Sequence, residues 1–374
     1  MAYRAVLATG ACVGLGFISL RSSQHTRKLL VGPLLGAGAY AFWHSGSILA
    51  YPYYAGKIAW FLLFFMQHMV YTLFLAQYKL PDRSWRTAYY WLFNARWIGT
   101  NQSTVMVRRR NRSLAQGQST NNSVALTRMQ FTLRRLGVVL LKYAVMVIYY
   151  EIIDMPTLLQ FQQSDYSPSK RILIRRIIRT DPTLDLKRES LIRTWVVFTW
   201  LLEDYISLSS MHDLFAVFFV GILGLDHPDD WPPLYGHLSD VTSLRTWYSQ
   251  FWQTLLYRYS VNTGNWAIDK CFGPRVGKQT RTRRILLASF VFTLSAMNHL
   301  ATEYVIYGIL NWWSFGWFLA QPLIFVVEDI VGVLVRTYLA WTQNLSQSTV
   351  SRWVGKLWVF SLFYWGILKF AFRS

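Results

Sequence analysis

Charge and cysteine are both scarce in this chain of 374 residues, and each scarcity excludes a class of protein. Only 15% of the residues are charged, against about 25% in a soluble globular protein. The two cysteines, Cys12 and Cys271, are too few for a disulfide framework or a thiolate metal cluster. What is present instead is apolar: 53% of the residues are hydrophobic and 17% are aromatic. This composition excludes disorder, collagen and coiled coil, and it indicates a membrane protein held together by packing.

Acidic residues are also few, since 18 Asp and Glu face 38 Lys and Arg and leave a formal net charge of +20. Such a surplus must contact something anionic. Lipid headgroups, nucleic acid and a phosphorylated cofactor all fit, and composition alone does not choose among them. No nucleic-acid-binding motif accompanies the charge, which disfavours the second of these partners.

Apolar runs long enough to cross a membrane recur along the chain, because a span takes about 20 mostly apolar residues. The clearest runs, all uncharged, are Leu29 to Gly56, Ile58 to Tyr78 and Gly308 to Val327. A shorter span, Ala5 to Leu20, resembles a signal sequence but is expected to be retained, because another apolar segment follows it closely. Further spans are expected at Gly137 to Ile153, Leu191 to Leu208, Leu214 to Leu225, Ile285 to Glu303 and Leu357 to Phe370. The sequence therefore predicts an all-α, polytopic integral membrane protein with about eight or nine transmembrane helices.

The loop at residues 79–135 is polar and basic, and the positive-inside rule places it in the cytosol. Its sequons at Asn101, Asn111 and Asn121 are therefore expected to carry no glycan. The basic loops at 154–190 and just before residue 285 belong on the same side by this rule, which simple alternation of the spans does not allow. Either one span between residues 137 and 225 is re-entrant, or an amphipathic helix around 170–179 lies on the membrane surface, and we favour a combination.

The predicted helix that starts at Ile285 carries a polar face, because Ser295, His299, Thr302 and Glu303 follow at spacings of four and three. Ionisable groups at membrane depth usually face a cavity, and histidine suits proton abstraction near neutral pH. His299 is therefore a candidate general base, the alternative being a structural histidine hydrogen-bonded to a neighbouring helix. Glu303 either orients the imidazole or pairs with an arginine of another helix.

The second informative region begins with Asp226, Asp229 and Asp230 in the run D-H-P-D-D-W-P-P-L-Y-G. Three carboxylates this close suggest a magnesium site for a diphosphate. The following prolines, however, indicate an extended loop, which favours a solvated turn at the membrane surface. His227 and His237 are too few and too poorly spaced for a zinc site, so no metal is expected.

The same region carries a family resemblance. The run W-P-P-L-Y-G and the later S-L-R-T-W-Y-S-Q-F-W-Q resemble the stretch Pro-Pro-Leu-Phe-Gly, then Ser-Leu-Arg-x-Phe-Trp-Gly-x-x-Trp-His, of the wax synthase-like branch of the membrane-bound O-acyltransferase superfamily. Three further patches are similar to that family: residues 95–99, the stretch L-S-A-M-N-H-L that ends after His299, and residues 318–329. The closest branch is that of the fungal terpenoid O-acetyltransferases.

The resemblance implies an enzyme that moves an acyl group, here acetyl, from acyl-CoA to a hydroxyl of a hydrophobic acceptor such as a terpenoid. It implies a substrate cavity or tunnel within the helices and His299 as the base that takes the hydroxyl proton. The family's upstream His or Asn corresponds to Gln253, whose amide donates hydrogen bonds but cannot act as a base. The stretch Phe-Trp-Gly is replaced by residues 247–249, Trp-Tyr-Ser, which is a second departure from the family pattern.

The resemblance also assigns the remaining site residues. Arg245, Arg258, Arg281, Arg283 and Arg284 are candidates for the CoA phosphates, the alternative being contacts with anionic lipid headgroups. Trp252, Ser295 and Asn298 are candidates for the acceptor site, although Asn298 points about 100° away from His299 on a helix. The expected partners are acyl-CoA, a hydrophobic small-molecule alcohol and the lipid bilayer.

We therefore expect one membrane-embedded domain over residues 1–374, with the basic polar loop at 79–135 and a motif-bearing loop at 226–284. The family implies the endoplasmic reticulum as its location. Two other functions fit the sequence: a long-chain alcohol wax ester synthase, and a non-catalytic binding or transport protein in which His299 and Glu303 form a buried pair.

Overall fold

The computed structural model describes residues 2–75, 84–98, 126–170, 172–277, 279–338 and 349–366. Within these ranges the regular structure is entirely helical, as predicted, and no strand occurs. By its internal contacts the chain divides into two units, and each is described by itself. This division does not test the predicted single domain, which stays a prediction.

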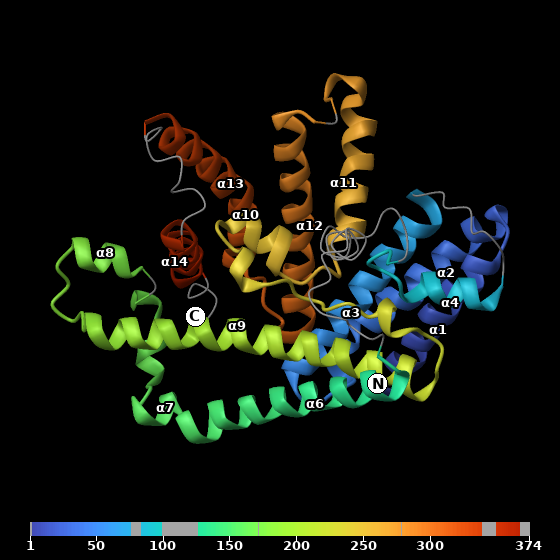
Figure 1. Cartoon of the computed structure of the whole chain (residues 1–374), viewed down its shortest axis with the longest axis horizontal. Coiled ribbons are helices and arrows are strands. Elements are labelled where there is room, and N and C mark those ends of the chain that lie inside the picture. The colour runs from blue at the N-terminus through green and yellow to red at the C-terminus, as the bar shows by residue number, and fades with distance from the viewer. Residues whose placement is uncertain are drawn as a thin grey trace. The chain divides into compact units, whose positions relative to one another are not determined.

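The first unit comprises Met1–Thr104 and Thr254–Tyr338. Its helices, coloured from blue to cyan and from yellow to red in Figure 1, are α1 (Ala2–Arg21), α2 (Gln24–Trp43), α3 (Pro52–Val70), which continues as a π-helical segment η2 (Tyr71–Leu75), α4 (Trp85–Phe93), α11 (Tyr257–Phe272), α12 (Arg281–Tyr307) and α13 (Trp312–Tyr338).

The second unit comprises Val105–Gln253 and Leu339–Ser374. Its helices are α6 (Arg128–Val147), continued by the π-helical segment η3 (Ile148–Ile153), α7 (Met155–Leu158), α8 (Leu173–Ile178), α9 (Leu186–Ala216), continued by η6 (Val217–Ile222), the short α10 (Leu244–Thr246) with η9 (Trp247–Phe251), and α14 (Thr349–Gly366). Figure 1 shows α6 and α9 running side by side.

Six helices of the described part are long and apolar enough to cross a membrane. They are Ala2–Arg21, Pro52–Leu75, Arg128–Leu158, Leu186–Ile222, Arg281–Tyr307 and Trp312–Leu334. An integral membrane protein is therefore confirmed, but the predicted count of eight or nine spans is not. Four of the predicted runs account for the difference.

The uncharged run Leu29 to Gly56 is not one span, as the sequence had suggested. Helix α2 ends at Trp43, a 3-10 turn follows at Ser45–Ser47, and α3 begins at Pro52 after an extended Tyr51. Pro52 occupies the first turn of α3, where its missing N–H is not needed. The boundary between α2 and α3 thus lies inside an apolar run that hydropathy alone treats as continuous.

The predicted spans Leu191 to Leu208 and Leu214 to Leu225 are instead one continuous helix, α9 with η6. Asp213 falls between the two predicted runs. The carboxylate is 3% exposed and pairs with Lys142 at 2.7 Å and with Arg135, both on α6. Because α6 supplies the opposite charges, the helix continues through an ionisable residue.

The remaining predicted segments are found in part. The basic stretch around 170–179 forms only the six-residue α8, whose Arg176 turns inward to Asp181 and Glu189 while Ile174 and Ile178 stay exposed. The run Leu357 to Phe370 overlaps α14, which is not among the six candidates, and its last residues lie outside the described ranges. Most of the 79–135 loop, with its three sequons, also lies outside them.

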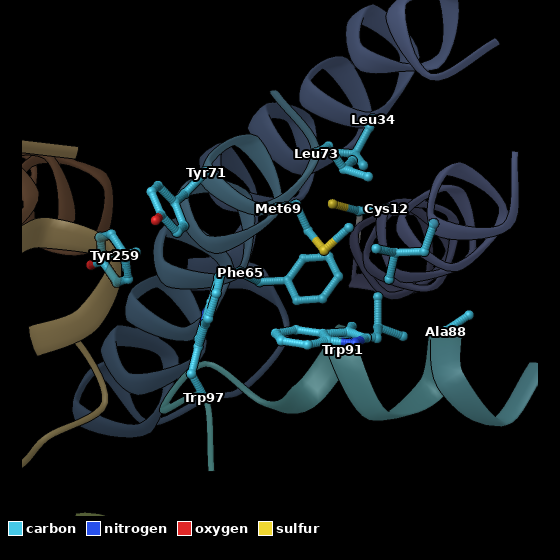
Figure 2. Close-up of a cluster of buried hydrophobic side chains, with 12 residues drawn as sticks. Cys12, Leu34, Phe65, Met69, Tyr71, Leu73, Ala88, Trp91, Trp97 and Tyr259 are labelled. Carbon is cyan, nitrogen blue, oxygen red and sulfur yellow. The ribbon is translucent and has the colours of Figure 1, made fainter. Parts of the chain in front are cut away.

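The core of the first unit lies where α1 to α4 converge. Figure 2 shows Cys12, Phe65, Met69 and Trp91 directed toward one another, each at most 5% exposed. The helices approach closely because Gly38 of α2 has no side chain: a Cβ there would lie 2.7 Å from Cγ of a methionine on α3. Small residues that let backbones come together are the usual basis of helix packing in membranes.

Helix α12 is held at its start by α11. The buried Arg283 guanidinium donates to Asp269 at 2.6 Å and to the Asn265 Oδ1 at 2.8 and 3.1 Å. One turn before Ile268, Gly264 of α11 faces α12 so closely that a Cβ would lie 2.8 Å from Leu287. These contacts fix the beginning of the helix that carries the predicted polar face.

We expect Gly264→Val to destabilise the protein by about 1–3 kcal/mol, because overpacking a close helix contact forces the helices apart. The matched control is Gly137→Val, since a Cβ at Gly137 meets nothing within 4 Å. The apparent melting temperature of the purified protein in detergent measures the effect. Equal melting temperatures for the two variants would contradict the close approach of α11 and α12.

Candidate functional site

The polar face predicted from the sequence lies on α12. His299, Ser295 and Glu303 are half-buried there, and Thr302 is buried. All four belong to a single unbroken helix, so the spacings of four and three place them on one side of it as expected. The hydroxyl of Thr302 makes no hydrogen bond within the described structure.

His299 is held by two aromatic rings from neighbouring helices. The ring of Phe318 on α13 stacks on the imidazole with a centroid distance of 4.2 Å and an interplanar angle of 15°. Trp60 on α3 meets it edge-on at 4.4 Å. Among the described residues no side chain or backbone group hydrogen-bonds the His299 nitrogens. The aromatic contacts thus fix the plane of the imidazole ring.

A cation lies near this ring. Lys57 stands one turn before Trp60 on α3, its Nζ lies 4.8 Å from the ring centroid of Tyr53, and its charge acts on His299. Sequence reasoning missed Lys57 and Trp60, because spacing within one helix does not show what a neighbouring helix presents. Phe318 could have been predicted, since it is the first residue of the stretch 318–329 that resembles the family.

Asn298, whose predicted contact with the acceptor remains a prediction, is paired with a residue of α3. Its side chain is 5% exposed and exchanges two hydrogen bonds with Gln67 of α3: Gln67 Nε2 donates to Asn298 Oδ1 at 2.8 Å, and Asn298 Nδ2 donates to Gln67 Oε1 at 3.2 Å. The predicted roles of Ser295 in acceptor binding and of Glu303 in orienting the imidazole remain predictions.

The two motif stretches of the 226–284 loop, which end at Gln253, lie in the second unit, and backbone hydrogen bonds join them. The N–H of Gly236 donates to the Phe251 carbonyl at 2.9 Å, and the N–H of Trp252 donates to the Trp247 carbonyl at 2.7 Å. The Tyr235 hydroxyl donates to the backbone of α9 at 3.2 Å. The two sequence stretches that carry the resemblance therefore form one folded element.

Trp252 belongs to an aromatic cluster within this element. Its ring is nearly parallel to Trp200 of α9 at 6.0 Å and to Trp247 at 5.4 Å, and Tyr235 meets it edge-on at 5.6 Å. Gln253 follows directly and is half-buried. The cluster fixes the backbone from which the Gln253 amide projects.

The arginines proposed for CoA differ in exposure. Arg281 and Arg284 at the start of α12 are exposed, whereas Arg245 and Arg258 are half-buried. Arg283, between the two exposed ones, is instead tied to α11 as described above. Arg281 and Arg284 thus do not hold α12 against α11 as Arg283 does. For both residues, binding of lipid headgroups remains the alternative to binding of CoA.

The segment that contains Gln253 and His299 is similar to known proteins. Residues 231–320, which include Gln253 and His299, match the Membrane bound O-acyl transferase family. In this segment the chain is similar to the membrane-bound O-acyltransferases. The family resemblance expected from the sequence is therefore confirmed.

Three curated relatives come from fungi. The acetyltransferase aurG of Calcarisporium arbuscula is 27% identical over 50% of this chain and 46% of its own length. An acetyltransferase of Fusarium sporotrichioides is 25% identical over 44% of this chain and 38% of its own length. The O-mevalon transferase yanI of Aspergillus niger is 28% identical over 38% of this chain and 35% of its own length. The chain thus spans less than half of these relatives, and no solved structure gives a significant match.

The first of the further patches similar to the O-acyltransferases, residues 95–99, contains a turn. Trp97 there has a φ of 53°, in the left-handed region that favours glycine. Its ring is 1% exposed and packs against Trp91 at 4.9 Å. Asn94 closes the turn, since its side chain accepts from the Ile98 N–H at 2.8 Å and donates to the Ile98 carbonyl at 3.0 Å. Burial of the indole therefore holds a backbone conformation that glycine adopts without strain.

A second departure lies at Trp247-Tyr248-Ser249, where the O-acyltransferase pattern ends in glycine. These residues form the π-helical segment η9 with buried Trp247 and Phe251. Burial raises the pKa of the Tyr248 hydroxyl, which therefore stays protonated at neutral pH.

The aspartates before the O-acyltransferase motif close a turn. Asp226 accepts from the Trp231 indole at 2.9 Å, and Asp230 accepts from the His227 N–H at 2.9 Å. Asp229 is exposed beside His227. No group of three or more His, Cys, Asp or Glu side chains suited to a metal occurs in the described ranges. The arrangement agrees with the expected turn.

The O-acyltransferase motif is anchored to the membrane helices through Arg135 of α6. This guanidinium pairs with Asp213 and also donates to the Trp231 carbonyl at 2.6 Å. Trp231 in turn stacks on Phe219 with an interplanar angle of 14°. The intramembrane ion cluster thus holds the start of the motif as well as the α6–α9 pair.

We expect Asp213→Asn to destabilise the protein by about 3–5 kcal/mol, because it leaves the positive charges of Arg135 and Lys142 without their counter-charge inside the membrane. Asp229→Asn, in an exposed turn, is the control. Thermal unfolding in detergent is the measurement. If both variants melt at the temperature of the unaltered protein, the ion cluster does not stabilise α6 and α9 as described.

Proposed function

We propose that the chain is a membrane-bound O-acyltransferase that moves an acyl group, acetyl by preference, from acyl-CoA to a hydroxyl of a hydrophobic acceptor such as a terpenoid alcohol. The matched family and the relatives named acetyltransferases support the reaction class. The hydrophobic acceptor has a physical basis as well, because the base lies on a membrane helix among aromatic rings. We expect the endoplasmic reticulum as the location and one catalytic domain over residues 1–374.

The observation that carries the proposal is the state of His299. It lies on α12, inside the matched segment, with its ring plane held by Trp60 and Phe318 and with no hydrogen bond from the described residues to its nitrogens. A purely structural intramembrane histidine needs a hydrogen-bond partner, because an unsatisfied polar group in hydrocarbon is unfavourable. An imidazole held by carbon contacts alone instead suits a base whose partner is a substrate.

In the proposed reaction one nitrogen of His299 takes the proton of the acceptor hydroxyl as its oxygen attacks the thioester carbonyl. A new C–O bond forms, and the carbonyl becomes a tetrahedral oxyanion. Its collapse breaks the C–S bond, and the departing CoA sulfur takes the proton from the imidazolium. The products are the ester and free CoA, and no acyl-enzyme is needed.

The other predicted residues have supporting roles in this proposal. The Gln253 amide donates to the thioester oxygen as negative charge develops on it, and Glu303 stabilises the imidazolium. Trp252 and Ser295 contact the acceptor. Arg245, Arg258, Arg281 and Arg284 bind the CoA phosphates in charge-assisted pairs. The similarity to a protein named O-mevalon transferase favours testing larger acyl donors beside acetyl-CoA.

We expect His299→Ala to lower acyl transfer by about 100-fold or more, which is the usual contribution of a general base. Microsomes containing the variant are incubated with labelled acetyl-CoA and a panel of terpenoid and long-chain alcohols, and ester formation is normalised to protein amount. Met297→Ala, exposed on the same helix, is the matched control and should retain activity. Undiminished transfer by His299→Ala would overturn the base assignment.

The role of Gln253 is tested separately. Gln253→Asn keeps an amide donor and should retain about a tenth or more of the activity, whereas Gln253→Leu should lose about 100-fold in kcat, the usual effect of removing one oxyanion donor. The kcat values of the two variants are compared at saturating acetyl-CoA. If Leu and Asn at this position give the same activity as glutamine, the amide does not contact the reacting thioester.

A further inference from the structure

Two carboxamides meet between α3 and α12 in the first unit. Gln67 and Asn298 exchange a pair of hydrogen bonds at 2.8 and 3.2 Å, and each amide is both donor and acceptor to the other. Both residues belong to candidate membrane spans, Pro52–Leu75 and Arg281–Tyr307. Asn298 is 5% exposed and Gln67 is half-buried.

A reciprocal amide pair defines geometry more strictly than an apolar contact does. The two hydrogen bonds are satisfied together only at one separation and one relative orientation of the side chains, and sliding or rotating either helix breaks both. In hydrocarbon no water replaces a lost partner, so the misaligned state leaves two amides unsatisfied. The pair thereby fixes the rotation of α12 about its own axis relative to α3.

The rotation of α12 decides where His299 points. Asn298 precedes His299 directly, and successive side chains on a helix differ by about 100° in direction. With the Asn298 side chain held against Gln67, the imidazole is directed to one place on the circumference. There it meets Trp60, which lies on the same α3 helix as Gln67, and Phe318 of α13. Asn298 and His299 of α12 thus both contact α3, the first through Gln67 and the second through Trp60.

We propose that Gln67 is a positioning residue for His299, acting through its amide pair with Asn298, and this inference rests on the proposed acyltransferase function. Neither amide touches the substrates. The pair holds the imidazole at the orientation in which a nitrogen reaches the acceptor hydroxyl, so its loss lowers the rate of the chemical step and leaves substrate binding unchanged.

The test measures kcat and KM for acyl-CoA and for the acceptor in Gln67→Leu and Asn298→Leu. We expect kcat to fall at least about tenfold in each, and both KM values to stay within about twofold, because a displaced base slows chemistry alone. The double variant Gln67→Asn with Asn298→Gln keeps the combined length of the pair and should recover kcat to within about threefold of the unaltered protein. Thr72→Val, which removes another buried polar group from the same span, is the control and should keep kcat.

Several outcomes overturn the inference. An unchanged kcat in Gln67→Leu removes the positioning role, and a raised KM at unchanged kcat places Asn298 in contact with substrate instead. A loss of kcat in Thr72→Val equal to that in Gln67→Leu, or no recovery in the exchanged pair, assigns the effect to general destabilisation. If the unaltered protein transfers no acyl group to any alcohol in the panel, the proposed function itself has failed, which is a separate result.

Discussion

The structure depends on one constraint: a polar side chain on a membrane helix must be satisfied by the protein or by a ligand. Asp213 is satisfied by Arg135 and Lys142, and the Asn298 amide by Gln67. His299 is different. Among the described residues its imidazole packs against the rings of Trp60 and Phe318 and makes no hydrogen bond. The proposed function follows from this contrast, because a substrate hydroxyl is then the missing partner.

Each satisfied group also positions an element that the proposed function uses. The Asp213 cluster holds the start of the motif through Arg135, and the aromatic cluster around Trp252 fixes the backbone that precedes Gln253. In the first unit the amide pair sets the direction of His299. Polar groups inside the membrane therefore set how neighbouring helices align in this chain. Van der Waals packing of apolar side chains supplies most of the stability of the helix contacts.

The helical class and the polar face of α12 were predictable, because hydrophobic run length and a spacing of three and four are local properties of the sequence. The helix boundaries were less so. One apolar run contains the end of α2 at Trp43 and the start of α3 at Pro52. Asp213 gave no sign that α9 continues through it, since its partners lie some seventy positions earlier in the chain. The surroundings of His299 were largely beyond prediction, because Trp60 and Gln67 come from a helix more than two hundred positions away. A contact between helices depends on packing, and no spacing within either helix encodes it.

The most direct test of the account is the reactivity of the His299 imidazole itself. Diethylpyrocarbonate acylates a neutral, accessible histidine nitrogen, and mass spectrometry of the α12 peptide measures how fast His299 is modified in intact membranes. The account predicts modification of His299, slowed by acceptor alcohol together with a non-reactive CoA thioether. An α12 peptide that stays unmodified while other histidines react, or a rate that the substrates leave unchanged, would contradict the claim that this nitrogen awaits a substrate hydroxyl.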